Sequence, residues 1–177
     1  MNTQAEGVWW INAINALSDE SSGAEEMSAC LVDYSLGELN IAAGKTKEAE
    51  NRFRRAAKNC EAENIQILAL TGLGLSLLEQ GKPEESLRTL LDAQTAANLS
   101  EDVFVAEDED RLLFSIAQVH LALGQNEPAC RILQRLTSRP KALEGIVGIQ
   151  TWPRLKGSLT LPSISSNAAR LAAKSCK

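Results

Sequence analysis

Residues 73–93, LGLSLLEQGKPEESLRTLLDA, combine two apolar segments with a glycine and a proline between them. Gly81 lacks a Cβ and can adopt the left-handed conformation that ends a helix. Pro83 suits the first turn of the next helix, because its missing N–H needs no partner there. The second segment has a helically spaced stripe of small and apolar residues, Ser86, Leu90 and Ala93. The stretch therefore predicts two antiparallel helices joined by a short turn.

The same ladder of small and apolar residues occurs three times, each with steps of 7, 5, 4 and 3 residues. The three copies are Gly37, Gly44, Ala49, Phe53 and Ala56; Gly74, Gly81, Ser86, Leu90 and Ala93; and Ala117, Gly124, Ala129, Leu133 and Leu136. The copies are shifted by 37 and then 43 residues, so the insertions fall between the units. Three helix pairs are predicted, with the first small residue of each ladder allowing the facing helix to approach closely.

This ladder resembles the tetratricopeptide repeat, a unit of about 34 residues in which a Trp-x-x-Leu-Gly-x-x-Tyr helix precedes a helix with Ala and an aromatic residue four positions later. The resemblance covers residues 30–143. Other residues occupy the Trp positions (Asp33, Leu70 and Leu113) and the Tyr positions (Asn40, Leu77 and His120). The resemblance implies an all-α, right-handed superhelix of three helix pairs, at about residues 30–63, 67–100 and 110–143.

The flanking segments are less regular. Val8–Leu17, which contains Trp9 and Trp10, is expected to form a capping helix on the first repeat. After the repeats, an irregular basic arm is expected, and Asn167–Ser175 is expected to form a short Ala-rich helix within it. The predicted domains are an N-terminal cap and acidic linker (1–26), three repeats (27–143) and the C-terminal arm (144–177).

Charge is distributed unevenly around the net value of −5. Residues 1–130 contain 9 Lys and Arg against 22 Asp and Glu, whereas residues 131–177 contain 9 Lys and Arg and a single acidic residue, Glu144. An acidic body repels phosphate, so nucleic-acid binding by the body is not expected. The basic tail could bind an acidic partner or RNA, but charge complementarity favours folding of the tail back on its own body.

Cysteine usage and hydropathy bear on the compartment. The four cysteines, Cys30, Cys60, Cys130 and Cys176, have no metal-ligand or redox spacing. The first three are expected to be small apolar residues within the repeats, and Cys176 is expected to be exposed and free. Met1–Gly7 lacks the basic residues and apolar block of a secretory signal, and no apolar stretch is long enough to cross a bilayer. A reducing intracellular location, cytoplasmic or nuclear, without a membrane partner, is expected.

Catalytic chemistry requires convergent groups, and the chain offers few. His120 is the only histidine, and it occupies a packing position of the ladder. No Cys-x-x-Cys or His-Glu-x-x-His spacing occurs, and Gly72-Leu73-Gly74 lies inside a predicted helix rather than in a phosphate-binding loop. We therefore expect no enzyme activity, no cofactor, no metal site and no small-molecule substrate.

If the resemblance holds, the first helix of each repeat lines a concave inner face. The implied groove residues are Leu31, Tyr34, Glu38, Ile41, Leu68, Thr71, Leu75, Leu78, Arg111, Phe114, Gln118 and Leu121. This lining is mainly apolar, with Arg111 as its one cation, so it does not suit the acidic tails that some repeats of this kind clamp. Tyr34 and Phe114 are the favoured anchors because aromatic residues dominate interface energies, while ordinary helix packing is the alternative for every groove residue.

These features favour a non-catalytic adaptor or scaffold that holds an apolar peptide or helix of another protein. Two alternatives remain. Chain length, acidity and three repeats also resemble a small chaperone of an export substrate. The chain could instead be a piece of a longer solenoid, with Trp9, Trp10 and the fading C-terminal pattern marking contacts to further repeats.

Overall fold

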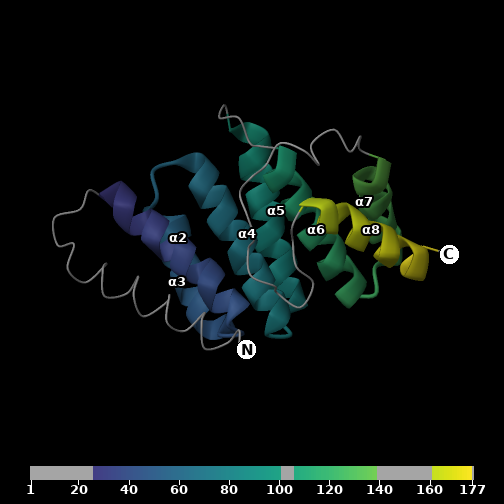
Figure 1. Cartoon of the computed structure of the whole chain (residues 1–177), viewed down its shortest axis with the longest axis horizontal. Coiled ribbons are helices and arrows are strands. Elements are labelled where there is room, and N and C mark those ends of the chain that lie inside the picture. Colours follow the sequence, from purple (N-terminus) through teal and green to yellow (C-terminus); the bar gives the residue numbers. More distant parts are fainter. Residues whose placement is uncertain (1–25, 101–105, 139–160, 177) are drawn as a thin grey trace. The chain divides into compact units, whose positions relative to one another are not determined.

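The computed structural model describes residues 26–100, 106–138 and 161–176, and within these ranges the chain is entirely helical (Figure 1). The helices are α2 (Glu26–Ala42), α3 (Thr46–Asn59), α4 (Glu63–Glu79), α5 (Pro83–Leu99), α6 (Ala106–Ala122), α7 (Asn126–Ser138) and α8 (Leu161–Ser175). The all-α prediction is confirmed. The predicted capping helix at Val8–Leu17 lies outside the described residues.

The chain divides into two compact units, residues 1–103 and 104–177. In the first unit, α3 packs between α2 and α4, and α4 also packs on α5 and, less extensively, on α2. In the second unit, α6 pairs with α7, and α8 packs on α7 and, less extensively, on α6. The predicted helix pairs are therefore α2–α3, α4–α5 and α6–α7. Their stacking into one right-handed superhelix stays a prediction.

The three turns within the pairs have the same geometry. Gly44, Gly81 and Gly124 have φ angles of 73°, 73° and 71°, which residues with a Cβ rarely adopt. In each turn the residue after the glycine donates its N–H to a carbonyl five positions earlier, as from Lys45 to Asn40 at 2.8 Å. This bond satisfies a carbonyl that the helix end leaves without an intrahelical partner. The predicted glycine helix ends are confirmed.

Small residues allow the helices of the first unit to approach closely. The Phe53 side chain of α3 is fully buried, and its ring lies where Gly37 of α2 and Gly72 of α4 would otherwise carry a Cβ. In the next pair, a Cβ on Gly74 would lie 2.5 Å from Cγ of Leu90. Phe53 and Leu90 hold the same position of the ladder, and each packs against a glycine of the preceding helix.

Two disulfides join Cys30 to Cys60 and Cys130 to Cys176, so the expectation of unpaired cysteines with a free Cys176 is wrong. Cys30 lies near the start of α2 and Cys60 directly follows α3, so their bond closes the first helix pair opposite its turn. Because disulfides persist mainly in oxidising compartments, the cysteine argument for a reducing intracellular location no longer holds.

The C-terminal helix folds back on its own unit. Helix α8 begins at Leu161, earlier than the predicted start at Asn167. Ala168 is fully buried in a cluster with five residues of α6 and α7: Leu113, Phe114, Ala117, Leu133 and Leu136. Leu171, Ala172 and Cys176 pack partly buried against this cluster. The return of α8 to the body was predicted from charge complementarity, but the contacts that hold it are apolar and covalent.

Candidate functional site

The predicted groove residues of the first unit lie on the neighbouring helices α2 and α4, and most of them are buried. Leu31 is 42% exposed, whereas Leu68 and Leu78 are partly buried. The buried members are Tyr34, Glu38, Ile41, Thr71 and Leu75. Leu31, Leu68 and Leu78 are therefore the predicted groove residues of this unit that keep apolar surface accessible.

The predicted groove residues of the second unit lie on α6. Arg111 and Phe114 are buried, at 8% and 1% exposure, whereas Gln118 and Leu121 are partly buried. Phe114 belongs to the apolar cluster that includes Ala168 of α8, and Leu121 packs against that cluster. The structure therefore brings these two residues together with the chain's own C-terminal helix.

The two aromatic residues favoured as anchors are core residues in this structure. Tyr34 packs against Phe53 with ring centroids 6.0 Å apart and the rings tilted by 55°. Phe114 has almost no exposed surface. Truncation of Phe114 would leave a cavity in the second unit, so its removal cannot separate binding from folding.

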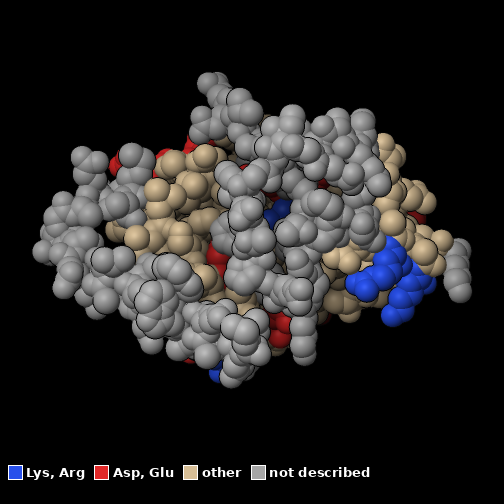
Figure 2. Space-filling view, in the orientation of Figure 1, with Lys and Arg blue, Asp and Glu red and all other residues tan. Residues whose placement is uncertain are grey.

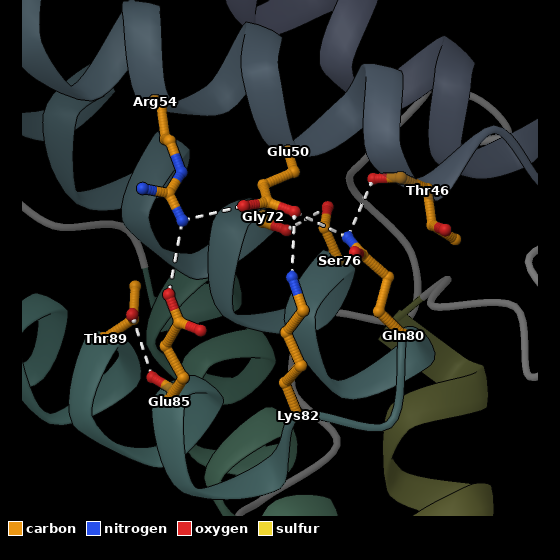
Figure 3. A network of polar contacts seen from close by, with 9 residues as sticks. All are labelled: Thr46, Glu50, Arg54, Gly72, Ser76, Gln80, Lys82, Glu85 and Thr89. Carbon is orange, nitrogen blue, oxygen red and sulfur yellow. Dashed lines mark hydrogen bonds and ion pairs between the residues drawn. The ribbon is translucent and has the colours of Figure 1, made fainter.

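A polar network connects the two repeats of the first unit (Figure 3). The Glu50 carboxylate on α3 accepts a hydrogen bond from Gln80 Nε2 at 2.8 Å and pairs with Lys82 Nζ at 3.5 Å. Nη2 of Arg54 lies 2.7 Å from Oε1 of Glu50 and 3.2 Å from Oε1 of Glu85 on α5. The network thus joins α3 to the end of α4 and to α5.

The protonation of Glu50 reflects this environment. Burial by itself would raise the pKa of Glu50. The hydrogen bond from Gln80 and the positive charges of Arg54 and Lys82 outweigh burial and lower the pKa below its usual range. Glu50 is therefore held in its charged form, which suits a structural junction between repeats.

A second ion pair occupies the position where the repeat usually has its leading Trp. Asp33 of α2 is buried, and its two carboxylate oxygens lie 2.8 Å from Arg52 Nη1 and 3.0 Å from Arg55 Nε of α3. The side chain of Arg55 is 61% exposed, so its charge remains hydrated on one side. An ionic contact between the paired helices thus replaces the usual aromatic packing.

The chain's histidine contacts a residue of the turn that follows its own helix. Nδ1 of His120 lies 2.6 Å from Oε1 of Gln125, across the turn that follows α6. No group of His, Cys, Asp and Glu side chains within residues 26–100, 106–138 and 161–176 is arranged to hold a metal ion. Among the described helices, none combines the length and apolar character needed to cross a bilayer.

Comparison with known proteins agrees with this architecture. A family model of the tetratricopeptide repeat matches residues 111–142, which contain most of α6 and all of α7. The match supports a tetratricopeptide repeat in this segment, and repeats of that family are protein–protein interaction modules and are typically non-catalytic. No curated protein and no solved structure matches the chain significantly.

Proposed function

We propose that this protein is a non-catalytic adaptor or scaffold that holds an apolar peptide or helix of another protein on the inner face of its repeats. The observation that carries the proposal is the recurrence of one helix-pair geometry, with the same left-handed glycine in all three turns. The third pair matches the family model of a protein-interaction repeat.

The accessible leucines of the inner face support an apolar partner. Leu31, Leu68 and Leu78 retain exposed surface on α2 and α4, and covering such surface contributes roughly 25 cal/mol per Å² before ordering costs. Arg111, the one cation of the predicted lining, is buried, which does not favour an acidic peptide.

The oxidised state of the four cysteines indicates the compartment in which the protein would bind its partner. Both pairs are oxidised in this structure. Oxidised structural cysteines are typical of extracellular, periplasmic or endoplasmic-reticulum proteins. An oxidising compartment therefore becomes part of the proposal, in place of the cytoplasm or nucleus. It also disfavours a chaperone that meets its export substrate in a reducing cytoplasm.

Affinity capture with matched surface variants tests the proposal. The full chain carrying Leu68→Glu and Leu78→Glu is compared with the wild type and with Leu91→Glu, which changes a 43% exposed leucine on α5. We expect the inner-face variant to lose its main captured protein and the α5 variant to keep it. Circular dichroism checks that all three chains fold. Equal capture by the folded chains would refute an inner-face site.

A further inference from the structure

Helix α8 occupies the place of an additional repeat helix. It packs on α7 and, less extensively, on α6, just as α4 packs on α3 and, less extensively, on α2. Yet residues 161–175 do not carry the ladder that defines the three repeats. A helix from outside the repeat pattern therefore covers the surface that another repeat would use.

The seat of α8 is apolar and involves predicted partner-binding residues. Ala168, Leu171 and Ala172 face the cluster of α6 and α7 that contains Phe114 and contacts Leu121. In contrast, Arg170 and Lys174 are exposed. Figure 2 shows basic side chains gathered over the end of the second unit where α8 lies in Figure 1. Helix α8 is thus an amphipathic helix that packs on α6 and α7 through small residues and one leucine.

The two disulfides differ in accessibility. Cys30 and Cys60 are each 2% exposed, which shields their bond from reagents. Cys130 and Cys176 are both only partly buried, and their bond fixes the end of α8 to α7. A reductant therefore reaches the bond that holds α8 more readily than the bond that closes the first helix pair.

We propose that the apolar α6–α7 surface is a docking site for an amphipathic helix, and that α8 occupies it until the Cys130–Cys176 bond is reduced. The partner helix has small residues four positions apart with a leucine between them, like Ala168, Leu171 and Ala172, and a polar outer face. This inference rests on the proposed function and deepens it, because it assigns a partner class and a redox control to the third repeat.

The release step is thiol–disulfide exchange with a dithiol reductant that acts locally within the otherwise oxidising compartment. A thiolate attacks one sulfur of the Cys130–Cys176 bond, which forms a mixed disulfide and releases the other cysteine. A second thiolate then attacks the reductant's sulfur in the mixed disulfide and releases the remaining cysteine. Two thiols become one disulfide, and the two cysteines each gain a proton as free thiols. Helix α8 then loses its covalent link to α7, and among its described side chains only Ala168 is fully buried.

Hydrogen exchange on the full chain tests the release. We expect Cys130→Ser with Cys176→Ser to speed exchange of α8 amides roughly tenfold or more, while α6 and α7 stay protected. Cys30→Ser with Cys60→Ser is the matched control and should leave α8 protection unchanged. Unchanged exchange of α8 in the first variant would overturn the proposal. Equal loss of protection in α6 and α7 would also overturn it, because no preformed docking surface would remain.

Peptide binding then tests the site itself. The full chain with Cys130→Ser, Cys176→Ser and Leu171→Glu is mixed with a labelled peptide of residues 161–176, LPSISSNAARLAAKSC, made with serine in place of its cysteine. We expect this chain to bind the peptide, and both the oxidised wild type and a Leu171→Glu peptide to show no binding. No binding by the variant while α6 and α7 remain protected would refute the site. Both readouts work without a cellular partner, so they can fail or succeed independently of the inner-face capture experiment.

Discussion

The ring of Phe53 fills the space in which Gly37 would carry a side chain, with its Cε1 atom 2.7 Å from the position of an ideal Cβ. The same ring blocks a Cβ on Gly72, so one aromatic residue of α3 is enclosed by a glycine on each of its two neighbouring helices. Phe53 therefore connects the first repeat to the second. Its fit depends on the absence of side chains on both sides.

Gly37→Ala should destabilise the first unit. Overpacking costs about 1–3 kcal/mol, whereas replacing a helical glycine returns up to about 1 kcal/mol of helix propensity, so we expect a net loss of up to about 2 kcal/mol. Urea unfolding measures the change. In a Phe53→Leu background the cost of Gly37→Ala should shrink, because the smaller side chain can move aside. An undiminished cost there would contradict the contact.

The turn glycines lead to a different prediction, because no atom lies within 4 Å of a Cβ added at Gly81. Gly81→Ala should therefore cost about 1–2 kcal/mol through its φ of +73° alone. Gly81→Asn should cost less, because Asn tolerates the left-handed region. Equal unfolding free energies for the Ala and Asn variants would show that backbone strain does not set the cost.

The helix pairs could be predicted from the sequence because their determinants are local and repeated. Gly44 ends a helix through its own φ, and Pro83 begins one through its missing N–H, whatever the rest of the chain does. The recurring ladder then identified which residues face each other. Fold class and turn positions follow from such features.

The disulfides were missed because motif spacing is the wrong signal for a bond between two helices. Cys30 and Cys60 lie 14 and 16 positions from Gly44, so a hairpin that turns at Gly44 brings its two ends, and with them both sulfurs, together. Distance from the turn would have found this pair. Cys130 and Cys176 are not placed symmetrically about a turn. They meet because α8 packs on α7, and this tertiary contact leaves no local signal in the sequence.

The exposure of the candidate site residues could not be predicted from the repeat pattern, because exposure depends on contacts that the pattern does not encode. Tyr34 and Phe114 have the helical register of an inner face, yet both are buried. For Phe114, the covering residues include Ala168, which no ladder predicts. Register gives the direction of a side chain, whereas distant segments decide whether it stays accessible.

Asp33→Asn should weaken the contact between α2 and α3. The buried carboxylate pairs with Arg52 and Arg55, and loss of its charge removes the ionic part of both contacts. Because both arginines retain solvent contact, we expect about 1–3 kcal/mol of destabilisation, less than for a fully buried pair. Glu127→Gln is the matched control, since it changes a highly exposed pair with Arg131 and should be nearly neutral. Similar thermal shifts in the two variants would argue against a special role for Asp33.

Removing the Cys30–Cys60 bond should lower stability without changing the fold. The bond closes a sequence separation of 30 residues, for which restriction of the unfolded chain stabilises by about 3–4 kcal/mol in the chain-entropy description. Cys30→Ser with Cys60→Ser should therefore lower the unfolding free energy of the first unit while its circular dichroism stays helical. A loss below about 1 kcal/mol would indicate that the native geometry offsets the constraint.

Acid should abolish the contribution of Glu50 to stability. A carboxyl with a lowered pKa in the folded chain stabilises fully above its ordinary pKa, and this stabilisation is lost as the pH falls through the lowered value. Glu50→Gln should cost about 1 kcal/mol near neutral pH, where Gln80, Arg54 and Lys82 lose a charged acceptor. The difference from the wild type should shrink as the pH falls through the lowered pKa of Glu50, because the wild-type carboxyl then becomes protonated as well. Urea unfolding at several pH values measures the difference in unfolding free energy between the wild type and Glu50→Gln. Glu48→Gln, which changes an exposed carboxylate, is the control. A pH-independent difference for Glu50→Gln would mean that lost packing, not lost charge, explains the cost.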